Sequence, residues 1–417
     1  MILAPVDFSK PPKSVTRMQL FQLKDGSTLP KKSIWWLLGV AAIALYSVYG
    51  WKVHNGQVGA DFIWRVTEAR YFAAKINPFD VFTGAIPEVP AYGAKAAAYS
   101  FSSYYFVNAL LKITTNPVTL LYLYSAVDVL ALLGGIYLVH KMSCAQTVWP
   151  LIFTLSTLLG SIFYWQHVYF LNYTLIATFG LIVLIYGDWK KKNALIIFGL
   201  LALSLKPTLA IPAVAYLIVR GRVKALLLCL VLYSAVLALA SQRLGESPRE
   251  LLQQLNLTHQ IFSLDKGYIY SEGIFIPLRK LLGINFNIFI IGVCFLILLI
   301  LRKLLTDPLQ AMLIVIALSI LLFYNQTHAW IMAYPVLIYA AANFQRKKSY
   351  IIAMIILVGF FITPRLLSLF PDDLKIMFAT MHNFVRFGSL FVLVLFFITS
   401  RQISCPVAAL KREDQIA

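Results

Sequence analysis

Long apolar segments separated by short basic ones limit the fold of this chain more than any other feature. Of its 417 residues, 60% are hydrophobic and 13% are charged, whereas a soluble domain carries roughly 25% charged residues. A backbone that enters lipid must satisfy its own polar groups, so such segments are expected to be helices. The sequence therefore predicts an all-α polytopic membrane protein. The expected spans are residues 33–52, 117–140, 148–165, 170–187, 193–205, 207–219, 224–241, 284–301, 309–325, 329–344, 349–363 and 380–400.

The net charge of +19 comes from short clusters of lysine and arginine that lie between the apolar spans. This distribution follows the positive-inside rule and differs from the single basic face of a nucleic-acid-binding protein, so nucleic acid is not an expected partner. Threading about twelve spans alternately through the membrane places these clusters and both termini in the cytoplasm. The main clusters lie at residues 190–192, 220–224, 302–303 and 346–348.

The expected domain organisation is one transmembrane unit, residues 33–400, between a basic cytoplasmic segment at 1–32 and a cytoplasmic tail at 401–417. The N-terminal segment lacks the apolar core of a signal peptide, so the first span is expected to remain uncleaved. Two external loops are long, at 53–116 and 242–283, and both contain amphipathic segments suited to the membrane interface. The four cysteines show no paired spacing, so neither an external disulfide nor a structural zinc site is expected.

Two neighbouring spans, 193–205 and 207–219, are too short to cross a membrane. About 13 helical residues reach about 20 Å, whereas the hydrocarbon core is about 30 Å thick. Basic clusters flank the pair, so we expect a short hairpin whose tip, residues 204–208, ends below the external surface. A lysine at this tip, Lys206, requires a polar cavity, and interrupted helices of this kind point to a substrate site. The alternative is that Lys206 snorkels or pairs with a carboxylate of the bundle.

Asp61, at the start of the first long external loop, is the strongest candidate for a catalytic residue. If residues 58–70 are helical, Asp61, Arg65 and Glu68 lie on one face. A carboxylate fixed where a membrane helix leaves the bilayer is costly without partners, and this makes it a functional candidate by default. We interpret Asp61 as a general base. The alternative is that it pairs with Arg65 one turn away and only anchors the helix.

Other polar residues near the external ends of spans are candidate substrate contacts. His328 has the chemistry to hydrogen-bond a phosphate or an acceptor hydroxyl, or it is an ordinary interfacial residue. Gln166, His167 and Asn172 lie where two spans meet, and hydrogen bonding between helices is the favoured interpretation there. The residues expected to line the substrate cavity are Arg65, Glu68, Arg70, Tyr104, Gln166, Asn172 and Gln326.

Three segments, in this order along the chain, resemble glycosyltransferase family 87, a bacterial membrane group. Residues 59–80 contain Gly-Ala-Asp-Phe and Asn-Pro-Phe-Asp, residues 198–207 end in Lys-Pro, and residues 328–335 begin with His-Ala-Trp. The likeness covers residues 33–345. Of the family's Gly-Gln-x-Asn motif, this chain keeps only Asn172.

The resemblance implies the fold of the C-type membrane glycosyltransferases, with about twelve transmembrane helices and amphipathic interfacial helices in the first external loop. It also implies inverting transfer of a hexose, with mannose expected, from a polyprenyl-phosphate sugar to a lipid or glycan acceptor. The active site would face the exterior of a bacterial inner (plasma) membrane. Asp61 would be the catalytic base, and Lys206 and His328 would bind the donor phosphate. Membrane lipids are the other expected partners, and neither a cofactor nor a metal is expected.

The main alternative function is that of a multi-span transporter or a flippase for lipid-linked saccharides. A transporter of this size predicts two related halves of six spans with polar residues at the midplane of both. This chain has instead one large, early external loop and one short hairpin. A lipid-binding assembly protein and an envelope-polymer ligase or polymerase are further alternatives.

Overall fold

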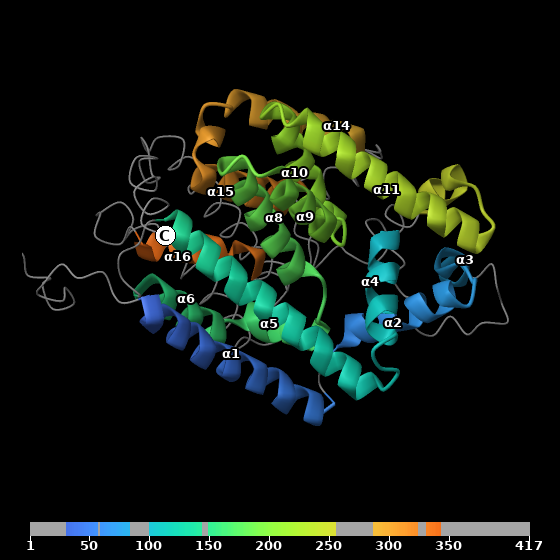
Figure 1. The fold of residues 1–417 in the computed structure, drawn as a ribbon, viewed down its shortest axis with the longest axis horizontal. Helices are drawn as coiled ribbons and strands as arrows, with labels where there is room; N and C mark the ends of the chain where they lie inside the picture. Colours follow the sequence, from blue (N-terminus) through green and yellow to red (C-terminus); the bar gives the residue numbers. More distant parts are fainter. Residues whose placement is uncertain are drawn as a thin grey trace, which may run out of the picture.

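The computed structural model describes residues 31–56, 59–83, 100–143, 149–255, 287–323 and 331–342. These residues form α-helices joined by turns and short 3₁₀ segments, and no strand occurs among them. The expected helical class is therefore confirmed for this part of the chain (Figure 1). The second half of the second long external loop and the last two predicted spans lie outside the described residues.

Three of the described helices are long and apolar enough to cross a membrane, judged by length and composition. They are α1 (Lys31–His54), α5 (Pro117–Met142) and α11 (Val223–Leu244). They match the predicted spans at 33–52, 117–140 and 224–241. These helices support a membrane protein, whereas the total of about twelve spans stays a prediction.

A bend interrupts the apolar segment expected at 148–165. α6 (Trp149–Gly160) and α7 (Ile162–Phe170) meet at 60°, which is the geometry of a broken span or a re-entrant loop. The next helix, α8 (Thr174–Trp189), starts later than expected, because Leu171 adopts a left-handed backbone conformation with φ of 53°. The turn between α7 and α8 therefore replaces the first residues of the span expected at 170–187.

Two short apolar helices occupy the residues of the predicted hairpin, whose depth in a membrane stays a prediction. α9 (Asn193–Leu203) and α10 (Pro207–Val219) are separated by three residues that include Lys206. α9 packs closely on α8, since a Cβ atom added to Gly180 would lie 2.8 Å from the carbonyl oxygen of Gly199. This close approach brings the hairpin tip to the N-terminal end of α8.

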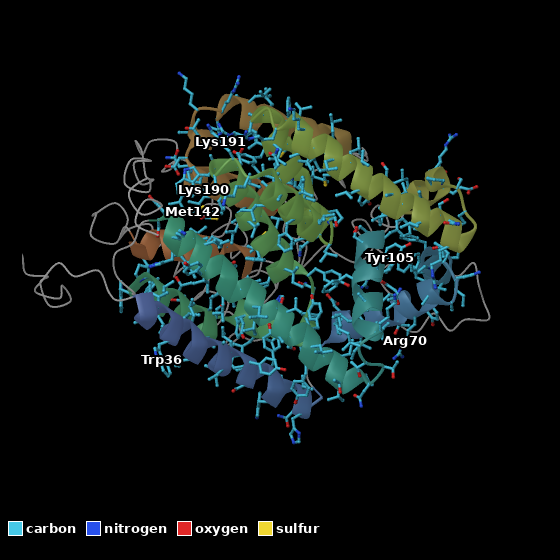
Figure 2. The ribbon with its side chains drawn as sticks, in the orientation of Figure 1. Trp36, Arg70, Tyr105, Met142, Lys190 and Lys191 are labelled. Atoms are coloured by element: carbon cyan, nitrogen blue, oxygen red, sulfur yellow. The ribbon has the colours of Figure 1, made fainter. Side chains whose placement is uncertain are left out.

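The remaining described helices complete a bundle around these elements. Figure 1 shows α1 beside α5, while α8, α9 and α10 occupy the centre. Met142, Lys190 and Lys191, at the ends of α5 and α8, lie toward one end of the molecule (Figure 2), and the membrane side of the basic clusters stays a prediction. The other bundle helices are α14 (Asn287–Ile300), α15 (Pro308–Leu322) and α16 (Tyr334–Ala342).

The helices of the predicted external loops form a separate group with its own small core. α2 (Ala60–Ala73), α3 (Pro78–Thr83) and α4 (Phe101–Leu111) lie near the end of α11, and residues 248–255 are also helical (Figure 1). Arg243 of α11 donates to the backbone oxygens of Phe72, at 2.8 Å, and of Ala73, so it satisfies carbonyl groups at the end of α2. The predicted amphipathic segments are thus helical where they are described. The core of this group consists of Phe72, Phe79, Phe101, Tyr104, Ala240 and Leu251.

Candidate functional site

Gly59 fixes the start of the helix that carries Asp61. Its φ of 83° lies in the left-handed region, and a Cβ atom at this position would lie 2.5 Å from a methyl carbon of Leu121. The Gly59 N–H donates to the backbone oxygen of Tyr169 at 2.8 Å. Any other residue would be strained here by the left-handed backbone and by the contact with Leu121. Glycine therefore allows the first turn of α2 to pack against α5 and α7.

Aromatic side chains hold the same turn from the other side. The ring of Phe62, next to Asp61, lies 4.2 Å from the ring of Tyr124 of α5, centroid to centroid. Tyr124 also contacts Tyr173, in the turn before α8, and both rings contact Phe106 of α4. This cluster joins α2, α4, α5 and the α7–α8 turn, and it places Asp61 at their junction.

Asp61 is partly exposed, but protein surrounds its carboxyl group closely enough that burial raises its pKa. The charges of Arg65, Lys206 and His167 act in the opposite direction, so all three groups lie within electrostatic range of this carboxyl. Among the residues that the structure describes, no side chain hydrogen-bonds the Asp61 carboxylate. Positively charged or basic side chains therefore surround Asp61, and its carboxylate oxygens are available to accept a hydrogen bond from a substrate hydroxyl.

Arg65 binds Glu68 rather than the side chain of Asp61. Its guanidinium group donates to the Glu68 carboxylate at 2.6 Å, and only its Nε approaches the backbone oxygen of Asp61, at 3.5 Å. Arg65 is 2% exposed and Glu68 is 0% exposed, so this ion pair is buried. In the alternative interpretation, Asp61 only anchors its helix by pairing with Arg65. The structure shows no ion pair between these two side chains.

Tyr104 joins this buried pair from α4. It is buried, and it interacts electrostatically with both Glu68 and Arg65. Its hydroxyl group and the second carboxylate oxygen of Glu68 have no hydrogen-bond partner in the described segments. Arg65, Glu68 and Tyr104 thus lie close together where α2 packs against α4, and their role as lining of a substrate cavity stays a prediction.

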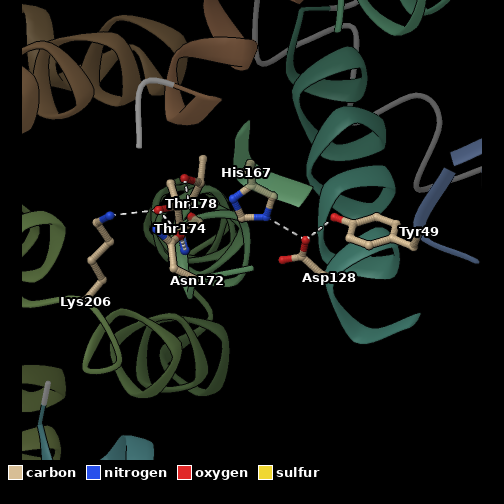
Figure 3. Close-up of polar contacts among 7 residues, drawn as sticks. All are labelled: Tyr49, Asp128, His167, Asn172, Thr174, Thr178 and Lys206. Carbon is tan, nitrogen blue, oxygen red and sulfur yellow. Dashed lines mark hydrogen bonds and ion pairs between the residues drawn. The ribbon is translucent and has the colours of Figure 1, made fainter. Parts of the chain in front are cut away.

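Lys206 lies within electrostatic range of the Asp61 carboxyl and is 8% exposed. Its Nζ atom donates to the Thr174 hydroxyl oxygen at 2.7 Å, and that hydroxyl donates to Asn172 Oδ1 at 2.6 Å (Figure 3). No carboxylate in the described part of the chain forms an ion pair with Lys206. Burial and the absence of an ion pair within these residues oppose the alternatives of snorkelling and of a structural salt bridge.

A second series of hydrogen bonds lies beside the contacts of Lys206, and the sequence analysis did not identify two of its members, Asp128 and Tyr49. The Asp128 Oδ2 atom of α5 lies 2.7 Å from His167 Nε2 of α7 and accepts a hydrogen bond from the Tyr49 hydroxyl of α1 at 2.5 Å (Figure 3). His167 thus forms the expected bond between helices. Asp128 is the one carboxylate within the predicted span 117–140, and this position was the signal that could have identified it.

Two of the expected cavity residues, Arg70 and Gln166, take no part in these contacts. Arg70 is exposed and donates to the backbone oxygen of Thr115 at 3.4 Å, away from Asp61 (Figure 2). Its long side chain projects from the opposite side of α2, because a helix turns by about 100° per residue. Gln166 is half-buried on α7, and its amide oxygen lacks a partner in the described segments. Gln326 and His328 lie outside the described residues.

Comparisons with known proteins give no match: no family model, no curated protein and no solved structure resembles this chain significantly. Within the described residues, no three side chains of histidine, cysteine, aspartate or glutamate group as metal ligands. The site brings a carboxylate, a lysine and a histidine within electrostatic range of one another, and an amide is linked to the lysine through Thr174.

The buried position of Glu68 predicts how stability depends on pH. Burial raises the pKa of Glu68 from its ordinary value of 4.5 to about 8, with Arg65 opposing the shift. The folded protein therefore holds this proton more tightly than the unfolded chain, and the contribution to stability is lost as the pH rises from about 4.5 to about 8. Thermal unfolding in detergent should occur at a lower temperature at about pH 8.5 than at about pH 6, and Glu68→Gln should reduce this difference.

The control for this measurement is Glu250→Gln. Hydrogen bonds from Ser247 lower the pKa of Glu250, so this carboxylate is ionised over the whole interval and its removal should leave the slope unchanged. An equal pH dependence in the wild type and in Glu68→Gln would contradict the prediction.

Proposed function

We propose that this protein is a membrane glycosyltransferase that uses a polyprenyl-phosphate sugar as its donor. The observation that carries the proposal is the position of Asp61, a partly buried carboxylate without a hydrogen-bond partner among the described side chains, within electrostatic range of the buried Lys206. A base and a phosphate-binding cation are the two groups that this reaction requires.

The chemistry follows from the donor. A sugar on a polyprenyl phosphate already has a good leaving group, so no strong general acid is required. Asp61 takes the proton of the acceptor hydroxyl while the acceptor oxygen attacks the anomeric carbon. Lys206 stabilises the charge that develops on the departing phosphate oxygen. One displacement without a covalent intermediate inverts the configuration at the anomeric carbon.

The finer assignments belong to the same proposal. The resemblance of residues 59–80 and 198–207 to glycosyltransferase family 87 favours the C-type fold with about twelve spans and a site on the external face. It also favours mannose as the sugar and a lipid or glycan as the acceptor. The short hairpin and the interfacial helices at the first external loop support this choice over a transporter with two related halves.

The test is a transfer assay with the purified full-length protein in lipid nanodiscs. Polyprenyl-phosphate mannose, glucose and galactose are supplied separately, with a bacterial lipid extract as the source of acceptors. We expect one of these donors to release polyprenyl phosphate and to label an acceptor with inverted anomeric configuration. Absence of release with every donor, together with flipping of the intact donor in liposomes, would replace the proposal by transport.

A further inference from the structure

The strongest unexplained feature of the site is a set of buried nitrogen atoms that have no hydrogen-bond partner in the described segments. His167 is 0% exposed and Asn172 is 2% exposed, yet His167 Nδ1 and Asn172 Nδ2 have no hydrogen-bond partner in the described segments. Lys206 uses one of its three N–H donors, on Thr174. A buried donor without a partner is destabilising, so a site that keeps several of them is prepared for an acceptor.

These nitrogen atoms belong to neighbouring side chains. Asn172 and Lys206 are linked through the hydroxyl of Thr174, and both His167 and Lys206 act electrostatically on the Asp61 carboxyl. Figure 3 shows His167 between Asp128 and the turn of α8 that carries Thr174 and Thr178. Lys206 and Asn172 together offer four unused N–H donors, because the lysine retains two and the amide has two. An oxyanion with several oxygens, such as a phosphate group, matches this set.

Asp128 determines which nitrogen of His167 remains available. Its Oδ2 atom accepts from Nε2, so Nδ1 is the nitrogen left on the other side of the ring. Asp128 is 0% exposed, and no lysine or arginine in the described part of the chain pairs with it. In its imidazolium form, His167 would place a cation beside this buried carboxylate and offer Nδ1 as a donor. Tyr49 donates to the same oxygen and holds the carboxylate in place.

We infer that His167 is a third phosphate-binding residue beside Lys206 and Asn172, and that Asp128 and Tyr49 are its positioning residues. The identity of the ligand as a lipid-linked phosphate rests on the proposed function, whereas the oxyanion site rests on the unpaired nitrogens. In the transfer step, the bond between the anomeric carbon and the phosphate oxygen breaks, and its electron pair remains on that oxygen. The bond to the acceptor oxygen forms and Asp61 takes the acceptor proton. His167 keeps its proton and donates a hydrogen bond to the phosphate.

The inference is tested by direct binding, with the full-length protein in nanodiscs. Polyprenyl phosphate and inorganic phosphate are the two probes, so that a contact with the phosphate group is separated from contacts with the lipid. His167→Gln retains an amide that can reach Asp128 but has no group at the Nδ1 position. A hydrogen bond to a charged group contributes about 1.5–3 kcal/mol, so we expect this variant to bind both probes about 10- to 100-fold more weakly.

Two further variants separate binding from structure. His167→Asn keeps a donor near the Nδ1 position and should recover part of the affinity that His167→Gln loses. His54→Gln, which changes an exposed histidine at the end of α1, is the matched control and should bind as the wild type does. Size-exclusion profiles and unfolding temperatures identify any variant that fails to fold.

A spectroscopic measurement tests the positioning role of Asp128. In the ¹⁵N spectrum of the histidine-labelled protein, the His167 signal is assigned by its loss in His167→Gln. Polyprenyl phosphate should shift the Nδ1 signal, because this nitrogen contacts the phosphate group. In Asp128→Asn this shift and the affinity for the probe should both be smaller.

The outcomes of these experiments separate the two proposals. If His167→Gln binds both probes as tightly as the wild type, or if Nδ1 does not respond to the probe, the inference is overturned even where sugar transfer is observed. If phosphate binding depends on His167 but no donor is ever turned over, the oxyanion site stands and the proposed transferase function fails.

Discussion

Replacing Asp61 by asparagine is expected to lower the rate of sugar transfer about 10²- to 10⁴-fold, which is the usual contribution of a general base. Asparagine has nearly the same shape but cannot take a proton from the acceptor hydroxyl. The packing of Phe62 on Tyr124 and the Gly59 contact with Tyr169 do not involve the Asp61 side chain, so α2 should keep its position. The measurement is the turnover number for the donor that the wild-type protein uses.

The matched control for this substitution is Asp80→Asn, which neutralises another carboxylate of the same external loop. Asp80 lies on α3, where its carboxylate accepts from Gln254 at 3.4 Å, so its loss should leave transfer within a few-fold of the wild type. Near-normal turnover of Asp61→Asn in correctly folded protein would refute the assignment of the base.

Replacing Lys206 by methionine is expected to weaken binding of the donor about 10- to 100-fold, because it removes a charged hydrogen-bond donor from the phosphate. Methionine fills a similar volume, so the hairpin tip should remain packed. The measurement is the dissociation constant for the polyprenyl-phosphate sugar. The control is Lys112→Met, which removes one positive charge at the exposed end of α4 and should leave the dissociation constant unchanged.

The pH dependence of turnover gives an independent test of the same lysine. Lys206 lowers the pKa of Asp61 through its charge, so Lys206→Met should raise the pKa of this carboxyl further. The base must be ionised to accept a proton, and the acid limb of the pH–rate profile should therefore move to higher pH. Unchanged donor affinity with an unchanged acid limb would show that Lys206 acts on neither the donor nor Asp61.

The elements that were predicted correctly are those whose signal is local in the sequence. The apolar length of α5 and the two short apolar runs that became α9 and α10 each specify a helix from neighbouring residues alone. The break between α6 and α7 was not predicted, because the apolar composition of residues 148–170 continues through it.

The candidate site was predicted in part. Spacing along a helix allows Arg65 to pair with either Asp61 or Glu68, and only the coordinates show that its guanidinium group binds Glu68. The contacts of Asp128 join residues that are 39 and 79 positions apart in the chain. No local pattern contains such pairs, so the position of Asp128 in a span could mark it as a candidate, but its contacts with Tyr49 and His167 required coordinates.

The sequence by itself determined that this chain is helical, apolar and interrupted by polar residues at a few defined places, because hydropathy and turn residues act over short distances. Only the tertiary structure decided which of these polar residues meet. Helix packing alone brings Lys206 to Thr174, aligns His167 with Asp128, and leaves the Asp61 carboxylate without a hydrogen-bond partner among the described side chains. Side-chain contacts across a bundle depend on the relative rotation and approach of helices, which the order of residues along one helix does not specify.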